Sequence, residues 1–506
     1  MKKSLLVGLI SVTATLSLIK FGIWDQPDRR WLIQDLYRRP ALSDKLTLAP
    51  DYPPISDLNK QYSATIQDAS RLESTTVAGV FQPRSTQEIQ AILKLAKQQG
   101  KKISMSGARH SMGGQIVYPD SLHLDMMKFD QIQYEPKDQS VTVQSGASWK
   151  QIQLELSKHN RAVRVMQDSN IFSVGGSLSS NIHGKDPRYG CIIESVISFK
   201  LLTADGQERR CSRTQNPDLF RAVIGGMGLF GVITEVTLKT DPNLTYAYRV
   251  EHQPADQMIQ TMEKYASNPK VGLIEAQMAI DQANFLNEAQ IYYFEETEPD
   301  PTVVDDVSGE NSIWLRKLVY RISRQSDAGK KFRWMMQKSI GPKLDPPKIT
   351  RNSSMAAPFR TLQLDQPDST DVLQEYFVPT DQVNTFLERY RALLHKHKME
   401  LLNVTVRKTI QDTEALVSYA TSDMYAFVSY YKIRKDSIGQ TQMTGFTRDM
   451  MDLLQSLKGT FYLTYKGYYT PEQIHKMYPG LKQLFRLKAK YDSQELFYNN
   501  WYASLK

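Results

Sequence analysis

Residues 103–115 read ISMSGARHSMGGQ, a short apolar strand pattern that runs into a loop with three glycines. Upstream, residues 77–81 have the composition of another strand, and Ser85 followed by Glu88 is a capping-box signature. Apolar residues then recur from 89 to 96 at helical spacing, so the order is strand, helix, strand, loop. A glycine-bearing loop lets backbone N–H groups approach a phosphate or an aromatic ring closely, and this stretch therefore indicates a ligand-binding loop.

Two further glycine-rich stretches follow. Residues 173–185 read SVGGSLSSNIHGK and are predicted as a second loop, and residues 225–231 read GGMGLFG. The latter contains G-x-G-x-x-G, but a helix-like stretch precedes it and a strand-like stretch follows it. The dinucleotide fingerprint needs the opposite order, so we reject a Rossmann motif. We interpret these glycines as sites of close backbone contact with a ligand or of tight packing.

The pattern changes near residue 243. Before it, a hairpin (132–143), a helix (148–158) and two strands (197–203 and 232–238) are predicted. After it come long amphipathic segments and strand-like runs, which together predict an α+β fold. Residues 312–340 are basic and amphipathic, and form either a helical pair over the substrate-binding region or a surface for an anionic membrane.

Composition excludes several classes of protein. The chain has 506 residues, with 63 Lys and Arg against 54 Asp and Glu, and this modest excess is spread along the sequence. No nucleic-acid-binding motif accompanies it, so we set nucleic acid aside as a partner. The two cysteines, Cys191 and Cys211, form neither a metal-ligand spacing nor a disulfide framework, and a bridge between them stays open. No pair of histidines or carboxylates has metal-site spacing, so no metal is predicted.

The N-terminus resembles a targeting segment. Lys2 and Lys3 precede an apolar run that ends near Trp24, close to the length that spans a bilayer. We expect residues 1–24 to be an uncleaved membrane anchor, with a cleaved signal peptide as the alternative. Lysines before the run and arginines after it argue for opposite orientations, so the side of the membrane stays open.

These motifs resemble the vanillyl-alcohol-oxidase, or PCMH-type, FAD-binding oxidoreductases. The loop at 107–115 is similar to the G-x-G-H-S-x-x-G-Q segment of cytokinin dehydrogenases and the G-H-S loop of sugar-lactone and alditol oxidases. Residues 182–206 and 225–231 resemble decaprenylphosphoryl-ribose oxidase. In the first group the matching histidine carries the flavin covalently, which implies an 8α-N-histidyl link through His110. Ala108-Arg109 departs from the usual second glycine of that pattern.

The resemblance implies FAD as cofactor and assigns residues to it. The loops that would hold FAD contain Ser106, Gly107, Ala108, Arg109, His110, Ser111, Gly114, Gln115, Val174, Gly175, Gly176, Ser179, His183, Gly184, Lys185, Gly228, Gly231 and Val232. The implied organisation is an anchor or signal at 1–24, a linker at 25–60 and a two-part FAD domain at 61–242. A substrate domain with an antiparallel sheet (243–470) and a C-terminal return to the FAD domain (471–506) complete it.

Catalytic candidates come from the second half of the chain. Residues 459–466 resemble a strand that presents a Tyr and a Lys to the active site, with Tyr462, Tyr465 and Lys466 as candidates. Residues 403–407 resemble an alditol-oxidase strand with a Glu and an Arg. Arg407 matches, whereas Thr405 stands where the Glu would be, which casts doubt on polyol chemistry. Either Lys466 or Arg407 would hold a hydroxylate, or a buried lysine would act as base.

The expected function is oxidation of a CH–OH group of a sugar, sugar lactone, polyol or sugar-lipid by hydride transfer to flavin N5. Amine oxidation of the cytokinin-dehydrogenase kind and a flavin-binding protein without turnover are the alternatives. The expected acceptor is oxygen or a quinone. The N-terminal segment makes membrane association and a lipid-linked sugar substrate part of the hypothesis.

Overall fold

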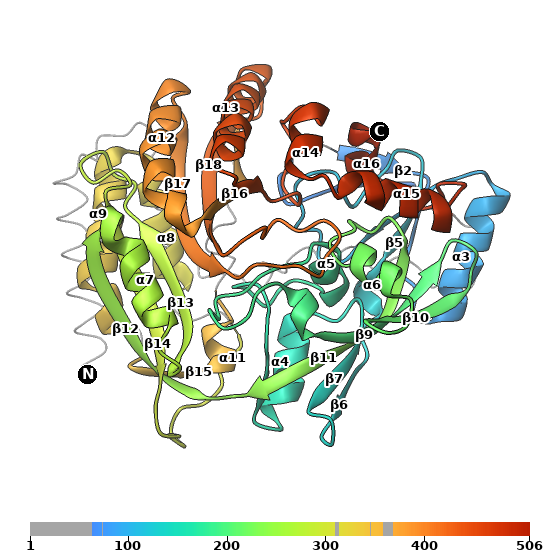
Figure 1. Cartoon of the computed structure of the whole chain (residues 1–506), viewed down its shortest axis with the longest axis horizontal. Coiled ribbons are helices and arrows are strands. Elements are labelled where there is room, and N and C mark those ends of the chain that lie inside the picture. Colours follow the sequence, from blue (N-terminus) through green and yellow to red (C-terminus); the bar gives the residue numbers. More distant parts are fainter. Residues whose placement is uncertain (1–62, 73, 309–312, 345, 358–367) are drawn as a thin grey trace.

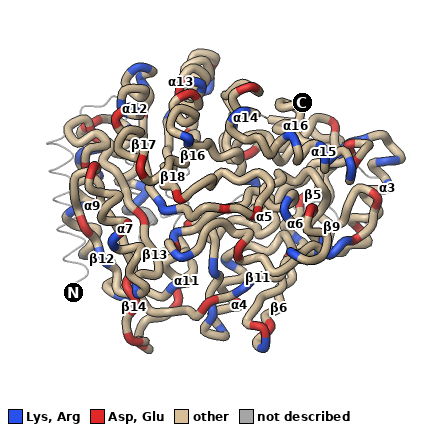
Figure 2. Tube along the Cα trace, in the orientation of Figure 1, with Lys and Arg blue, Asp and Glu red and all other residues tan. Residues whose placement is uncertain are grey.

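The computed structural model describes residues 63–72, 74–308, 313–344, 346–357 and 368–506 (Figure 1). The expected anchor and linker, residues 1–60, lie outside the described residues. Within the described part, no helix is long and apolar enough to cross a bilayer. The chain has an α+β fold, and both signs of charge are distributed over the whole molecule (Figure 2).

The first part of the chain forms two sheets and a small hairpin. The hairpin pairs β1 (Ala64–Gln67) with β2 (Ser74–Val77). A three-stranded parallel sheet follows, with strands β3 (Gly79–Phe81), β5 (Leu122–Asp125) and β4 (Ile103–Ser106) in that order. Helix α3 (Thr86–Gln98) connects β3 to β4 and buries its apolar stripe against this sheet. Its N-cap is Ser85, whose side chain accepts from the Glu88 N–H, as the capping signature predicted.

The second sheet of this part is antiparallel. Its strands are β10 (Glu208–Ser212), β9 (Val196–Thr203), β11 (Gly231–Pro242), β7 (Ser140–Gln144) and β6 (Ile132–Glu135), with β8 (Arg161–Val163) paired to β11. Its helices are α4 (Trp149–Ser157), α5 (Val174–Ser179) and α6 (Pro217–Val223). Because α6 precedes the 225–231 stretch and β11 follows it, the structure confirms the order that excluded a Rossmann motif.

Two local predictions were wrong. Residues 174–179 form the short helix α5 instead of a loop, because Gly175 packs so closely on Ser145 that an added Cβ would lie 2.8 Å from the Ser145 Cβ. Packing thus overrides the poor helix propensity of two consecutive glycines. The predicted strand at 459–466 pairs only at β19 (Thr460–Phe461), since Tyr465 N–H donates to the Tyr462 carbonyl and turns the chain.

The rest of the chain builds one eight-stranded, largely antiparallel sheet. Its strands in order are β15 (Lys348–Thr350), β12 (Thr245–Pro254), β14 (Glu288–Glu296), β13 (Val271–Met278), β17 (Glu400–Thr409), β18 (Met424–Arg434), β16 (Ser369–Pro379) and β19. Helices α7 (Met258–Ala266), α12 (Val383–Lys396) and α13 (Ser437–Ser456) cover one face of it. On β16 the alternation is clear, since Tyr376 packs on α12 whereas Glu375 points to the opposite face.

The sheet face that carries Glu375 lies opposite the glycine-rich loops of the first part of the chain. The basic stretch forms the helical pair α8 (Ile313–Ser323) and α9 (Asp327–Ser339), followed by α10 (Gly341–Leu344) and, after β15, by α11 (Arg351–Ser354). Helices α8 and α9 pack together beside this face, as the helical-pair alternative predicted. The face and the glycine-rich loops therefore enclose a space between them.

The C-terminus returns to the start of the described chain. It forms α14 (Pro471–Met477), α15 (Leu481–Tyr491) and α16 (Asn500–Leu505), which lie next to the N-terminal sheet in Figure 1. Ile103 N–H donates to the Leu496 carbonyl at 2.7 Å, and Tyr498 N–H donates to the Ile103 carbonyl at 2.9 Å. These bonds extend the three-stranded sheet beyond β4 and fix the strand from which the 107–115 loop emerges.

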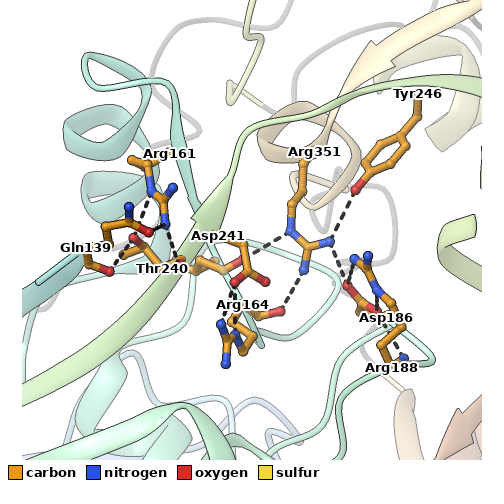
Figure 3. Close-up of polar contacts among 10 residues, drawn as sticks. Gln139, Arg161, Arg164, Asp186, Arg188, Thr240, Asp241, Tyr246 and Arg351 are labelled. Atoms are coloured by element: carbon orange, nitrogen blue, oxygen red, sulfur yellow. Dashed lines mark hydrogen bonds and ion pairs between the residues drawn. The ribbon is translucent and has the colours of Figure 1, made fainter. Parts of the chain in front are cut away.

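Arg351 ties the two parts together (Figure 3). Its side chain is 1% exposed and donates to Asp186 at 2.7 Å and to the Arg164 carbonyl at 2.7 Å. Arg164 in turn pairs with Asp241 on β11 at 2.7 Å. One buried guanidinium thus links α11 of the second part to β8 and the 182–188 loop of the first.

Candidate active site

A cavity of about 650 Å³ lies between the glycine-rich loops and the open face of the eight-stranded sheet. It is lined by most of the residues predicted from sequence: Ser106, Gly107, Ala108, Arg109, His110, Ser111, Gln115, Gly175, Gly176, Ser179, His183, Lys185, Gly228, Gly231, Val232, Arg407, Tyr462 and Tyr465. Four predicted residues lie outside this lining: Gly114, Val174, Gly184 and Lys466. Residues from five separate stretches of the sequence therefore meet at one place.

The 107–115 loop accommodates Arg109 at the position where the family pattern has a second glycine. Arg109, which stands where a second glycine is usual, has φ +59°, a left-handed conformation that favours glycine. Its guanidinium donates to Asp125 at 3.0 Å, and Asp125 is fully buried at the end of β5. This ion pair holds a conformation that costs a non-glycine residue about 1–2 kcal/mol. The loop keeps the backbone course that a glycine would take.

The loop also contacts α5 closely. A Cβ added to Gly107 would lie 1.8 Å from the Ser173 hydroxyl oxygen, so only glycine fits at this crossing. At the far end of the loop, the Gln115 side chain donates to the Leu463 carbonyl at 2.6 Å. The glycine-rich segments and the 462–465 turn are therefore fixed against one another.

His110 lies inside the cavity wall. Its ring stacks edge-on against Phe172 with centroids 4.8 Å apart, and burial lowers the pKa of His110 to about 4. The imidazole is therefore neutral near pH 7. Behind the loop, His123 is hydrogen-bonded to Ser104 and Ser106, each at 2.9 Å. Burial, with a contribution from the charge of Arg109, lowers the pKa of His123 to about 3.

The polar atoms of the lining fit a cofactor such as FAD. Among the described residues, the buried hydroxyls of Ser111, Ser145 and Ser169 have no hydrogen-bond partner, and all three line the cavity. Buried polar groups are normally paired, so such orphans point to a polar ligand. Gly228, with φ +75°, presents bare backbone from the 225–231 stretch to the same cavity. Hydroxyls, exposed backbone and apolar walls together suit a phosphate-bearing flavin.

A buried carboxylate–imidazole pair lies where the eight-stranded sheet borders the cavity. Glu375 on β16 contacts His183 Nε2 through Oε1 at 2.5 Å, and both side chains are about 95% buried. Tyr465 donates to the other oxygen of Glu375 at 3.5 Å. Burial, with the charge of Glu375, raises the pKa of Tyr465 well above its usual value, so this phenol stays protonated. Sequence analysis did not identify Glu375 as a site residue.

The candidates at 462–466 have different placements. Tyr462 lines the cavity, and its hydroxyl donates to the Ser180 carbonyl at 2.9 Å. Tyr465 also lines the cavity, beside Glu375. Lys466 is half-buried, and its ammonium lies 5.3 Å from the centre of the Tyr468 ring, outside the cavity lining. Of Tyr465 and Lys466, only Tyr465 lines the cavity.

Next to this group are two cations and two carboxylates. Lys185 Nζ contacts Asp168 at 2.5 Å and Glu275 at 3.5 Å, and Arg407 lies 3.5 Å from Asp168 and 3.4 Å from Glu275. Burial opposes the charge of Lys185, but Asp168 and Glu275 raise its pKa above the usual value. Against the same opposing effect of burial, Lys185 and Arg407 hold the pKa of Asp168 below its usual range. Two cations thus face two carboxylates, and their formal charges balance.

The neighbouring strand supplies the carboxylate that Thr405 lacks. Strands β13 and β17 pair Gln277 with Thr405 and Ala276 with Val406, and the same register brings Glu275 opposite Arg407. An acid therefore lies beside Arg407, from β13 instead of β17. Asp168 and Glu275 were missed because neither has a local motif around it.

In the described part of the chain, no group of three or more His, Cys, Asp or Glu side chains is placed to hold a metal ion. Both cysteines are buried and free, so they form no bridge with each other. Neither lines the cavity. The chemistry of the site therefore depends on the groups described above and on what binds among them.

Comparisons with known proteins agree with this placement. Residues 77–212 match the family of FAD binding domains, and residues 301–505 match the D-arabinono-1,4-lactone oxidase family. L-gulonolactone oxidase of Mus musculus is 32% identical over 163 residues, which is 32% of this chain and 37% of that protein. D-arabinono-1,4-lactone oxidase of Candida albicans is 29% identical over 187 residues, 34% of this chain and 33% of that protein.

Cytokinin dehydrogenase 2 of Arabidopsis thaliana is 28% identical over 183 residues, 35% of this chain and 36% of that protein. The aligned region thus spans only about a third of the length of each of these relatives.

Proposed function

We propose that this chain, which belongs to the PCMH-type FAD-binding oxidoreductases, oxidises a CH–OH group of a sugar or sugar lactone with FAD as hydride acceptor. The observation that carries the proposal is the Glu375–His183 pair. It lies in the same cavity as the glycine-rich cofactor loops. Glu375 belongs to the stretch that matches the lactone-oxidase family, and His183 to the stretch that matches the FAD binding domain. The family match at 301–505 favours a lactone-like sugar over an amine.

Oxidation of an alcohol removes a proton from the hydroxyl oxygen and a hydride from the carbon that bears this oxygen. FAD, when bound, supplies the hydride acceptor at N5. We assign Glu375, held by His183 at 2.5 Å, as the base that takes the hydroxyl proton. The carbon is left as a carbonyl, and the proton stays on the Glu375–His183 pair until it passes to solvent. His183, fixed by the 182–185 loop, positions the carboxylate.

The remaining polar groups hold the alcohol. Tyr465 stays protonated, and its single O–H makes only a long 3.5 Å contact with Glu375. This O–H can turn from Glu375 to the oxygen that becomes the carbonyl. Lys185 and Arg407 remain charged because Asp168 and Glu275 pair with them. Since the four charges balance, this region suits neutral hydroxyl groups, which use both donors and acceptors.

The test is flavin reduction under anaerobic conditions. The full chain carrying FAD is mixed with L-gulono-1,4-lactone, D-arabinono-1,4-lactone and the related free sugars, and flavin bleaching is followed at 450 nm by stopped flow. We expect bleaching by at least one lactone, slowed about 10²–10⁴-fold in Glu375→Gln, because a general base contributes that much.

Glu400→Gln is the matched control, since Glu400 lies on β17 and pairs with Lys432 at 3.1 Å outside the cavity lining. Equal rates for Glu375→Gln and the control would refute the assignment of the base. A flavin that no sugar or lactone bleaches would refute the function. Bleaching by amines alone would establish the cytokinin-dehydrogenase alternative.

We further propose His110 as the covalent attachment point of the flavin. The residue lies in the cofactor loop, and its imidazole is neutral above pH 4, as a nucleophile toward the flavin 8-methyl carbon requires. After acid precipitation we expect yellow colour in the pellet, and in His110→Ala we expect the flavin in the supernatant. Release of the flavin from the unmodified chain would refute the link and leave the proposed oxidation untouched.

The electron acceptor and the membrane form the last part of the proposal. We propose oxygen as acceptor for the reduced flavin, with a membrane quinone as the competing acceptor. Residues 1–24 are the basis for membrane association and for a lipid-linked substrate. After anaerobic reduction, reoxidation by air-saturated buffer and by a soluble quinone is compared. Oxygen that reoxidises the flavin more slowly than the quinone would reverse this assignment.

A further inference from the structure

Arg333 on α9 is a half-buried cation that faces the cavity without a carboxylate partner among the described residues. It lines the cavity and donates to the Leu402 carbonyl at 2.8 Å and to the Asn403 side-chain oxygen at 2.6 Å. Within the described ranges, no Asp or Glu lies within ion-pair distance of it, and burial lowers its pKa. Its guanidinium also lies 5.4 Å from the centre of the Tyr320 ring.

The contrast with the rest of the cavity gives this observation its weight. Lys185 and Arg407 each have two carboxylates within 3.5 Å, from Asp168 and Glu275. Arg333 has instead two neutral acceptors, which use only two of its five N–H groups. A charge largely withdrawn from water is normally paired. The guanidinium of Arg333, which lines the cavity without an acidic partner among the described residues, therefore leaves a site for an anion.

The surroundings of Arg333 suit an oxyanion. Arg316 on α8 and Gln337, one turn along α9, also line the cavity. Gln337 donates to Gln277 at 2.9 Å, and Gln277 donates to Asn403 at 2.6 Å. This chain of neutral amides fixes the Asn403 oxygen that accepts from Arg333. A planar guanidinium held in this way presents its remaining donors as a fork that fits carboxylate or phosphate oxygens.

The position along the sheet relates this site to the reacting carbon. Asn403, Thr405 and Arg407 all line the cavity from β17, and the register puts Thr405 opposite Val428 and Val428 opposite Glu375. Asn403, which accepts from Arg333, therefore lies two strands, or roughly 10 Å, across the sheet and two residues, or roughly 7 Å, along it from the assigned base. We propose that this end of the cavity is an oxyanion subsite, in which Arg333 binds a carboxylate or phosphate-ester group of the substrate, remote from the oxidised CH–OH carbon. The proposal rests on the proposed function for the identity of that carbon, but not for the anion site itself.

The experiment measures anion binding without turnover. Isothermal titration calorimetry of the full, FAD-saturated protein at constant low ionic strength uses inorganic phosphate and succinate as probes. We expect saturable binding of at least one probe, and the tighter one identifies the source of the oxyanion. Loss of a charged hydrogen-bond donor in Arg333→Gln should weaken it roughly tenfold to hundredfold. Arg333→Lys keeps the charge but not the fork, and should weaken it less.

Arg249→Gln is the matched control, because Arg249 on β12 is an exposed arginine 3.8 Å from Glu295 and lies outside the cavity lining. It removes the same charge from the molecule and should leave binding within about twofold. Absence of saturable binding, or equal weakening in Arg333→Gln and Arg249→Gln, would overturn the subsite. Because calorimetry needs no oxidation, a protein that binds the probe but oxidises no sugar would refute only the proposed function.

Discussion

Replacing Arg351 by methionine should destabilise the whole molecule and loosen the active site. Methionine keeps much of the buried stem but removes the guanidinium that joins α11 to the first part of the chain (Figure 3). The change leaves the carbonyls of Val163 and Arg164 without these donors, which lie 3.3 Å and 2.7 Å away. Each orphaned buried carbonyl costs about 1–3 kcal/mol.

The charge of Asp186 sets the remainder of the effect. Arg188 still donates to both oxygens of Asp186, at 2.9 Å and 2.7 Å, so the carboxylate stays paired after Arg351 is removed. We therefore expect a total loss of about 3–5 kcal/mol in the free energy of unfolding, as is usual when one member of a buried ionic network is removed. Arg188→Met removes the more exposed partner and should cost only about 1 kcal/mol, since its side chain is 35% exposed.

The assay is urea unfolding of both variants beside the unmodified chain, followed by tryptophan fluorescence and by flavin release. Lys185 gives a second readout, because its ammonium donates at 3.0 Å to the Ser354 carbonyl on the same short helix as Arg351. Arg351→Met should therefore raise the KM for a lactone in addition to lowering stability. If Arg351→Met costs no more than Arg188→Met, the reasoning that Arg351 joins the two parts is wrong.

Three further predictions follow from other buried groups. Because the pKa of His123 is about 3 in the folded chain and near 6.5 when unfolded, stability falls as the pH drops below 6.5. The loss from His123 alone should reach about 2 kcal/mol at pH 5, and His123→Gln should flatten urea-unfolding midpoints measured between pH 7 and 5. The free energy of unfolding in urea should be about 1 kcal/mol larger for Arg109→Gly than for Arg109→Ala, since only glycine relieves the positive φ. Equal free energies for the two variants would contradict this. Burial raises the pKa of Cys191 well above its usual value and that of Cys211 to about 12, so a thiol reagent at pH 8 should modify both only in urea.

Elements with a strong local signal were predicted well from the sequence. Helix α3 has its capping residue, its apolar stripe and a closing glycine within sixteen residues, 85 to 100, and it forms as expected. The 225–231 stretch was interpreted correctly because its flanking helix and strand are both local features. Where the outcome depended on a contact made elsewhere, prediction failed. The helix at 174–179 exists because of Ser145, and the turn after β19 ends a strand that the sequence alone would continue.

The site itself shows the same division in physical terms. The cofactor loops are continuous stretches, so their glycines and His110 were found by pattern. The charged group around Arg407 is assembled across strands, from Asp168, Lys185, Glu275 and Arg407, and has no linear motif. Arg333 comes from a helix that sequence analysis placed only as a basic amphipathic segment.

Thr405 shows why a substituted motif residue need not mean a lost function. On β17 alone, the missing glutamate casts doubt on polyol chemistry. In the sheet, the antiparallel register with β13 puts Glu275 opposite Arg407, so the arginine keeps a carboxylate within 3.4 Å. Cross-strand neighbours lie only about 5 Å apart, so an acid on β13 reaches the guanidinium as well as one two residues away on β17. The doubt raised by the sequence therefore concerned a position on one strand, whereas the chemistry requires a charge at a point in space that either strand can supply.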